Sequence, residues 1–191
     1  QPYGIDAWWQ DATEPENDDL YNRRINNGKV PGEVYRNVYP IYVNKTVYEG
    51  LRKDAPHKRA MILTRSGFSG MQRYAAATWS GDVGNDWETL RRQIAGGLNQ
   101  MASGLPWWTY DAGGFFRPGD QYTDKVYRER FLRWLQASTF FPLMRVHGYM
   151  SQTEPWHYGK EVEDITAKYI HLRYSMLPYI YSHAAEVSFS G

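Results

Sequence analysis

Five residues that could take part in a hydrolytic reaction each follow a short apolar stretch of the sequence. They are Asp11 in AWWQD, Arg65 in ILTRSG, Asp82 in TWSGD, Asp111 in WWTYD and His147 in MRVHG. A pair of carboxylates suits hydrolysis at an anomeric carbon, because one can attack while the second protonates the departing oxygen and then activates water. Two such displacements retain the configuration of the sugar when the carboxyl groups lie roughly 5 to 5.5 Å apart.

The two carboxyl groups of such a pair must differ in charge, because one attacks as an anion and the other donates a proton. Arg65 near the first group and apolar neighbours such as Trp79 near the second would supply that difference. Three of the five residues also have a structural alternative. Asp82 could be an ordinary turn residue in SGDVGND, Arg65 could be a salt-bridge partner, and His147 could be a structural histidine.

The chain is rich in aromatic residues, with 8 Trp and 16 Tyr, and 16% of its residues are Phe, Trp or Tyr. An aromatic ring can stack on the apolar face of a pyranose while neighbouring polar groups take the hydroxyls. The same composition also fits an aromatic-rich core, in which Trp8 and Trp9 would simply fill the wall of a barrel. Composition alone leaves both interpretations open.

Several other functions are disfavoured by the sequence. The 22 basic residues nearly cancel the 21 acidic ones, so no strong positive field favours nucleic acid as a partner. The longest apolar runs are far shorter than the roughly 20 residues needed to cross a bilayer. Cysteine is absent, His157 and His171 have no second ligand at metal spacing, and no glycine-rich phosphate-binding loop occurs. We therefore expect neither a metal nor a cofactor.

Short apolar or aromatic runs predict five strands that would carry these residues at their ends. The runs cover residues 3–9, 59–64, 75–79, 105–110 and 141–146. Apolar residues at helical spacing predict helices between and after them, over residues 38–51, 87–101, 127–138 and from 162 past Pro178. Gly104 should end the second helix, Thr123 or Asp124 should cap the third, and Pro178 should kink the last.

Strands that alternate with helices in this way favour βα units and a parallel sheet, which makes the chain an α/β protein. In such folds the reacting groups gather after the carboxyl ends of the strands, where the loops converge. The five strand ends would then place Asp11, Arg65, Asp82, Asp111 and His147 around one mouth. No repeat or low-complexity linker is visible, so residues 1–191 are predicted to lie within one domain with no internal boundary.

At these residues the sequence resembles glycoside hydrolase family 31, the α-glucosidases and α-xylosidases, over nearly the whole chain. GIDAWWQDATEP is similar to the family's nucleophile segment, in which Trp9 lies two residues before the aspartate and Glu14 three residues after it. RSGFSGMQRYAAATWSGD is similar to the segment that joins a substrate-contacting arginine to the acid/base. Its matching residues are Arg65, Arg73, Trp79 and Asp82.

Two shorter motifs complete the resemblance. The family's DIGGF is DAGGF here, which implies that Asp111 hydrogen-bonds sugar hydroxyls in the −1 subsite. Arg145-Val146-His147 keeps the family's R-x-H pattern, which implies a similar hydroxyl-binding role for His147. Four motifs in the right order, each after a predicted strand, leave little room for coincidence.

The resemblance implies a (β/α)8 TIM barrel whose nucleophile ends the fourth strand, so that the chain would run from strand four to strand eight of an incomplete barrel. It implies a retaining, exo-acting α-glycoside hydrolase with Asp11 as nucleophile and Asp82 as general acid/base. Trp9, Arg65, Trp79, Asp111 and His147 would bind the sugar. Ala12 and Thr13 stand where many α-glucosidases carry methionine and asparagine, which favours an α-xylosidase acting on xyloglucan oligosaccharides over an α-glucosidase.

A different class of function also stays open, in which the chain is a non-catalytic carbohydrate-binding or structural piece. An incomplete barrel has unpaired strand edges and an exposed apolar face, so it would pair with itself or with the missing barrel segments. The isolated chain is therefore expected to be inactive. Its first residues carry no targeting signal and resemble the interior of a larger domain. The sequence does not determine where in the cell the protein acts, although a periplasmic or extracellular location is favoured.

Overall fold

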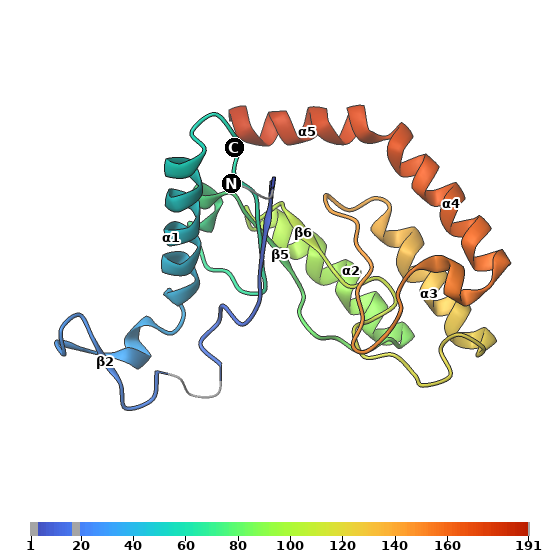
Figure 1. Ribbon diagram of the computed structural model, residues 1–191, viewed down its shortest axis with the longest axis horizontal. Helices are drawn as coiled ribbons and strands as arrows, with labels where there is room; N and C mark the ends of the chain where they lie inside the picture. The colour runs from blue at the N-terminus through green and yellow to red at the C-terminus, as the bar shows by residue number, and fades with distance from the viewer. Residues whose placement is uncertain (1–3, 17–19, 191) are drawn as a thin grey trace. The chain divides into compact units, whose positions relative to one another are not determined.

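The computed structural model describes residues 4–16 and 20–190, which form two compact units divided after Trp79 (Figure 1). The first unit contains three parallel strands, β1 (Trp8–Gln10), β4 (Ile62–Thr64) and β5 (Ala76–Trp79). Each lies within a predicted strand or overlaps one, although residue 3 lies outside the described part. The parallel pairing confirms the prediction of βα units.

The register of these strands places their carboxyl ends together. Gln10 is the partner of Thr64, and Thr64 is the partner of Thr78. Every residue of β5 is buried, as expected for a parallel strand that is covered on both faces. The loops that leave β1 and β4 therefore begin side by side.

Helix α1 (Tyr39–Asp54), predicted over residues 38–51, connects β1 to β4 and has Pro40 in its first turn. Between β1 and α1 the structure also contains a small antiparallel pair, β2 (Arg24–Ile25) and β3 (Val30–Pro31), followed by the 3-10 turn η1 (Gly32–Tyr35). A second 3-10 turn, η2 (Met71–Tyr74), precedes β5. The sequence did not indicate these short elements, since they are too brief to show a periodic pattern.

The second unit contains the four remaining helices, a short strand and a 3-10 turn. In chain order these are α2 (Trp87–Ala102), β6 (Trp108–Thr109), α3 (Lys125–Ser138), η3 (Pro155–Tyr158), α4 (Lys160–Ser175) and α5 (Leu177–Ser190). Asp86 caps α2 by accepting a 2.8 Å hydrogen bond from the Thr89 amide. Asp124, one of the two predicted caps, accepts two amide hydrogen bonds of 3.0 Å at the start of α3. The predicted long last helix is divided at Met176, just before Pro178.

The predicted strand over residues 141–146 is replaced by an irregular segment. Its one bridge joins Val146 to Ala112 in a parallel sense. Arg173 of α4 donates hydrogen bonds to the carbonyl oxygens of Phe141 and Pro142, the latter at 2.8 Å. A guanidinium, and not a neighbouring strand, thus satisfies these backbone acceptors, which is why an apolar run here does not become a regular strand.

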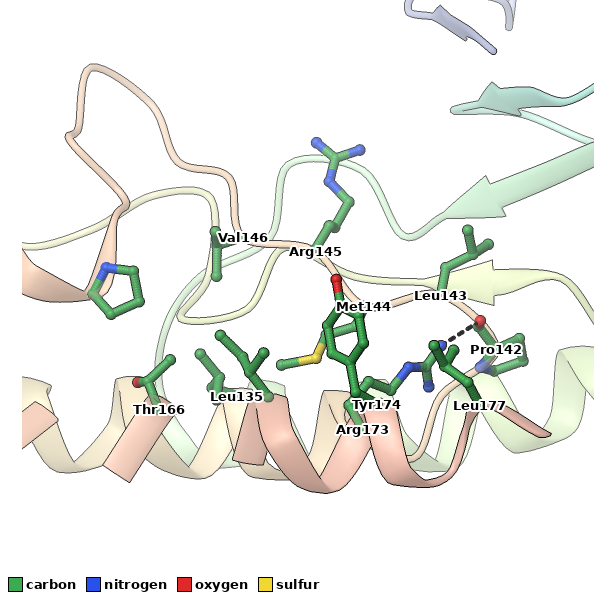
Figure 2. A pocket seen from close by; sticks show the side chains of 12 residues that line it. Leu135, Pro142, Leu143, Met144, Arg145, Val146, Thr166, Arg173, Tyr174 and Leu177 are labelled. Atoms are coloured by element: carbon green, nitrogen blue, oxygen red, sulfur yellow. Dashed lines mark hydrogen bonds between the residues drawn. The ribbon is translucent and has the colours of Figure 1, made fainter. Parts of the chain in front are cut away.

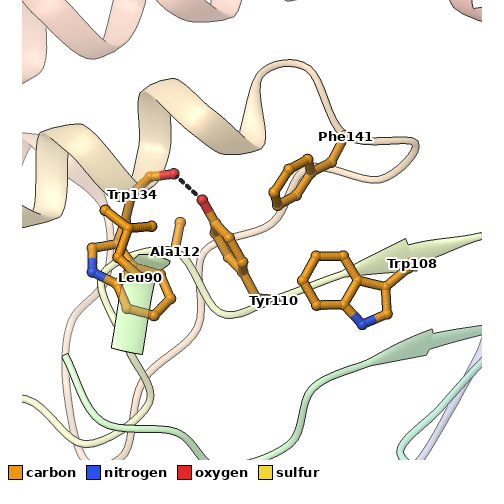
Figure 3. Packing of buried hydrophobic residues seen from close by; sticks show 6 residues of the cluster. All are labelled: Leu90, Trp108, Tyr110, Ala112, Trp134 and Phe141. Carbon is orange, nitrogen blue, oxygen red and sulfur yellow. Dashed lines mark hydrogen bonds between the residues drawn. The ribbon is translucent and has the colours of Figure 1, made fainter. Parts of the chain in front are cut away.

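Aromatic side chains dominate the core of the second unit. Figure 3 shows one cluster, in which the Tyr110 hydroxyl donates a hydrogen bond to the Trp134 carbonyl. The Tyr110 ring packs against the rings of Phe141 and Trp108. A second cluster joins α3, η3 and α4, and its buried members are Tyr127, Phe131, Leu135, Tyr158 and Val162. Part of the aromatic content is therefore structural, which was one of the two interpretations of the composition.

Two adjacent glycines of α2 provide a test of this packing. A Cβ added at Gly97 would clash with the buried ring of Trp108, whereas one added at the exposed Gly96 would meet nothing within 4 Å. We expect Gly97→Ala to lower the free energy of unfolding by about 1–3 kcal/mol through overpacking. Gly96→Ala should raise it by about 0.5–1 kcal/mol, because alanine favours the helix. Urea unfolding of both variants measures the difference, and equal effects would contradict this packing.

Candidate active site

The first unit brings two predicted site residues together at the ends of β1 and β4. Asp11 follows β1 and Arg65 follows β4, and Arg65 Nη1 lies 3.2 Å from Asp11 Oδ1. The same carboxylate oxygen accepts a 2.9 Å hydrogen bond from the Ala12 amide. Asp11 is 43% exposed, so a partly accessible carboxylate is held in a defined direction by a cation and a backbone donor.

Arg65 also binds two further carboxylates. Its Nε donates a 2.7 Å hydrogen bond to Glu14 Oε1, and its Nη2 forms ion pairs with Glu14 and Glu16. The salt-bridge alternative for Arg65 is therefore what the structure describes, while its direct contact with a sugar stays a prediction. Sequence reasoning named Glu14 only through the resemblance and missed Glu16. The excess of acidic residues in ATEPEN was the available signal.

The loop after β1 is fixed by a small cluster of hydroxyl groups. Thr13 Oγ1 lies 2.6 Å from Thr64 Oγ1 and 2.8 Å from Ser66 Oγ. Ala12, directly after Asp11, has a φ of +50°, which costs a residue with a side chain roughly 1–2 kcal/mol. The cluster at Thr13 and the ion pairs of Arg65 hold this strained turn, and with it the direction of the Asp11 side chain.

Two of the predicted sugar-binding tryptophans lie in the same unit and contact each other. The ring centroids of Trp9 and Trp79 are 5.7 Å apart, with the planes tilted by 34°. Trp9 is 50% exposed, whereas Trp79 is 3% exposed. Trp9 thus offers an accessible aromatic ring two residues before Asp11, and the buried Trp79 packs against it.

The second unit brings together the loops that carry Asp82, Asp111 and His147. The amides of Phe115 and Phe116 donate 3.0 Å and 3.1 Å hydrogen bonds to the Val83 carbonyl, next to Asp82. Gly114 lies so close to this loop that an added Cβ would be 2.6 Å from the Gly84 carbonyl oxygen, and its φ is +81°. Gly114 of DAGGF is therefore required where the two loops meet.

Asp111 is fully buried and is paired with Arg145, a residue that sequence reasoning left without a role. Arg145 Nε lies 2.9 Å from Asp111 Oδ1, and the Asp111 side chain is 0% exposed. The amide of Ala112 donates a 3.3 Å hydrogen bond to the Arg145 carbonyl, which brings the two segments side by side. A buried carboxylate requires a partner, and Arg145, which the sequence showed only as the first residue of the R-x-H pattern, provides it.

His147 lies two residues after Arg145 and is half-buried. Its ring centroid is 5.6 Å from that of Phe115, which belongs to the loop after Asp111. Asp82, Asp111 and His147 are thus carried by three loops joined through residues 112–116. Asp11 and Asp82 belong to different units, so their meeting across one sugar ring stays a prediction.

An apolar pocket of about 440 Å³ lies between α3, α4 and the segment 142–146 (Figure 2). Met144 points into it, while Arg145 points away, as neighbours on an extended segment do. None of the described residues that line it is acidic. The pocket therefore offers no carboxylate for a two-carboxylate reaction, and none of the residues predicted for the site lines it.

Within residues 4–16 and 20–190, no helix combines the length and the apolar character that spanning a membrane would need. In the same part of the chain, no three histidine or acidic side chains gather where they could hold a metal ion.

Comparison with known proteins identifies the family. Residues 1–183 match the model of the glycosyl hydrolases family 31 TIM-barrel domain. The chain belongs to glycosyl hydrolase family 31. The resemblance noted from the four motifs is confirmed, and so is the TIM-barrel domain, of which the parallel strands and helices form part. The numbering of the strands from four to eight stays a prediction.

Three relatives within family 31 are similar along almost the whole chain. An α-xylosidase of Saccharolobus solfataricus is 50% identical over 188 residues, which are 95% of this chain and 25% of the relative. α-Glucosidase 2 of Bacillus thermoamyloliquefaciens is 35% identical over 198 residues, covering 98% of this chain and 24% of the relative. The crystal structure of the α-xylosidase from Xanthomonas citri matches with a TM-score of 0.87 and 38% identity, over 97% of this chain and 22% of that one. The chain thus spans about a quarter of the length of these relatives.

Proposed function

We propose that this chain supplies both catalytic carboxylates of a retaining, exo-acting α-glycoside hydrolase, and that the sugar released is α-linked xylose from xyloglucan-type oligosaccharides. One observation carries the proposal. A partly exposed carboxylate, Asp11, is directed by Arg65 and the Ala12 amide at the end of β1, in a chain that is 50% identical to an α-xylosidase. Strand ends are where TIM barrels carry their catalytic groups.

In the proposed reaction an Asp11 carboxylate oxygen attacks the anomeric carbon, and the bond from that carbon to the leaving-group oxygen breaks. Asp82 gives its proton to the departing oxygen, and a covalent glycosyl ester of Asp11 remains. Asp82 then takes a proton from water as the water oxygen attacks the same carbon and releases Asp11. Two inversions leave the sugar with its original α configuration.

The other site residues bind and orient the sugar in this proposal. The exposed face of Trp9 stacks on the ring, with Trp79 as its support. Asp111, with its charge balanced by Arg145, accepts hydrogen bonds from ring hydroxyls, and His147 donates hydrogen bonds to them or accepts from them. Arg65 directs Asp11 and is the remaining candidate for a contact with the sugar.

An α-glucosidase of the same family is the second candidate, and the likeness to α-glucosidase 2 favours it. Glucose differs from xylose by a hydroxymethyl group at C5, so the two activities differ in whether the site accommodates that group. Ala12 and Thr13, which stand where many α-glucosidases carry methionine and asparagine, are the residues whose resemblance to α-xylosidases favours xylose. A non-catalytic carbohydrate-binding or structural role is the alternative from another class.

Turnover of nitrophenyl α-xyloside and nitrophenyl α-glucoside distinguishes these functions. Both substrates are given to the 191-residue chain and to the complete polypeptide that carries it. We expect the complete polypeptide to hydrolyse the xyloside faster, to release the α-anomer first, and the 191-residue chain to be inactive. Preference for the glucoside would support the second candidate. Binding of oligosaccharide without turnover of either substrate would support the non-catalytic role and overturn the proposal.

A further inference from the structure

Arg117 lies in the loop after β6 and donates hydrogen bonds to four different groups. Its Nε donates to the Gly114 carbonyl at 3.0 Å, and its Nη1 donates to the Tyr158 hydroxyl at 2.6 Å. Its Nη2 donates to the Ala112 carbonyl at 2.7 Å and to the His147 carbonyl at 3.0 Å. All these partners belong to the second unit, and the guanidinium satisfies them without an acidic neighbour among these contacts.

The two bonds from Nη2 join the segments that carry two predicted sugar-binding residues. Ala112 directly follows Asp111, and His147 is itself the other residue. A single nitrogen therefore fixes the distance between the backbone after Asp111 and the backbone of His147. The bond from Nε to Gly114 fixes the same guanidinium to the glycine turn that contacts the loop after Asp82.

The guanidinium is itself rigidly supported. It lies 5.4 Å from the centre of the buried Phe131 ring, and a Cβ added at Gly148 would be 2.6 Å from its Nε. Burial raises the pKa of Tyr158 and Arg117 opposes that rise. Tyr158 stays protonated at neutral pH, so it accepts from Arg117 and donates its own proton to Gln121 Oε1 at 2.8 Å.

We propose that Arg117 is a positioning residue that holds Asp111 and His147 at the separation needed to bind the hydroxyls of one sugar. The inference rests on the proposed function. Arg117 does not touch the sugar and acts through the two loops. Misplacing a substrate-orienting group by about 1 Å can lower the rate on the order of 10²-fold. Lysine cannot replace the guanidinium, because its single ammonium lacks the planar fork that reaches carbonyls in different directions.

The test compares Arg117→Lys with Arg128→Lys in the complete polypeptide. Arg128 is a matched control, since it is also half-buried and its Nε donates a 2.9 Å hydrogen bond to the carbonyl of Tyr122, away from the predicted site residues. A fluoro-sugar that traps the covalent intermediate counts the working sites in each preparation. For Arg117→Lys we expect kcat/KM per labelled site to fall on the order of 10²-fold, with a raised KM. For Arg128→Lys we expect kcat/KM per labelled site to equal that of the wild type.

A merely structural role gives a different result. If Arg117 only stabilises the fold, Arg117→Lys will lower the number of labelled sites and the melting temperature, but each labelled site will keep the wild-type kcat/KM. That outcome would overturn the inference. Failure of the proposed function is distinguished by the wild type, which would then be neither labelled nor active on any aryl α-glycoside.

A double-variant cycle with His147→Ala adds a second readout. If Arg117 acts by placing His147 and Asp111, part of its effect on kcat/KM is lost once the His147 side chain is removed. The fold-decrease in kcat/KM of the double variant will then be smaller than the product of the fold-decreases of the two single variants. Independent, multiplicative effects on kcat/KM would show that Arg117 does not act through His147, and would contradict the inference.

Discussion

Asp11→Ala in the complete polypeptide should abolish covalent labelling by a fluoro-sugar and lower turnover of an aryl α-xyloside on the order of 10⁴- to 10⁶-fold, the range seen when a catalytic unit loses an essential member. The physical reason is that, in the proposed reaction, the Asp11 carboxylate forms the bond to the anomeric carbon. In the structure Asp11 is held by the Arg65 guanidinium at 3.2 Å and by the Ala12 amide at 2.9 Å. Mass spectrometry of the intact protein detects the adduct, and its peptide identifies the residue.

Asp6→Ala is the matched control for this experiment. Asp6 precedes the same strand, is 77% exposed and pairs with Lys58 at the surface. Such a pair contributes little, so Asp6→Ala should be labelled and should turn over substrate as the wild type does. Labelling that survives Asp11→Ala would show that another residue is the nucleophile.

Asp82→Ala should slow hydrolysis of substrates with poor leaving groups by about 10²- to 10⁴-fold, the usual contribution of a general acid. Substrates with a good leaving group need no proton, so their first step should be slowed much less. Azide needs no general base, so it should attack the glycosyl ester and restore turnover while yielding an α-glycosyl azide. Rates across a series of substituted phenyl α-xylosides, with and without azide, measure both effects.

Asp86→Ala is the matched control for Asp82. Asp86 lies four residues later and caps α2 through the Thr89 amide and hydroxyl, and these hydrogen bonds keep the pKa of Asp86 below its ordinary value. Its loss should cost about 1 kcal/mol of stability at neutral pH. It should change neither the dependence on the leaving group nor the response to azide. If Asp82→Ala behaves like Asp86→Ala, the turn-residue alternative for Asp82 is correct.

The sequence determined the local elements wherever a regular pattern extended over several turns. The prediction of a helix over residues 87–101 agrees with α2 (Trp87–Ala102), because apolar spacing, a capping aspartate and a following glycine all act within a turn of the residues that they affect. The three parallel strands of the first unit were predicted from short apolar runs, which are also local features of the sequence. The order of the four motifs was enough to identify the family, which the family match over residues 1–183 confirms.

Only the tertiary structure decided which side chains bind one another. Arg65 lies 51 residues from Glu14, and Arg117 lies 30 residues from His147 and 41 from Tyr158. No local pattern specifies such pairs, since they depend on how separate loops pack. For the same reason the apolar run 141–146 failed as a strand. Its carbonyl groups at Phe141 and Pro142 are taken by Arg173, more than 30 residues later in the chain. The residue types that could do chemistry are thus visible in the sequence, whereas their partners and directions follow from long-range packing.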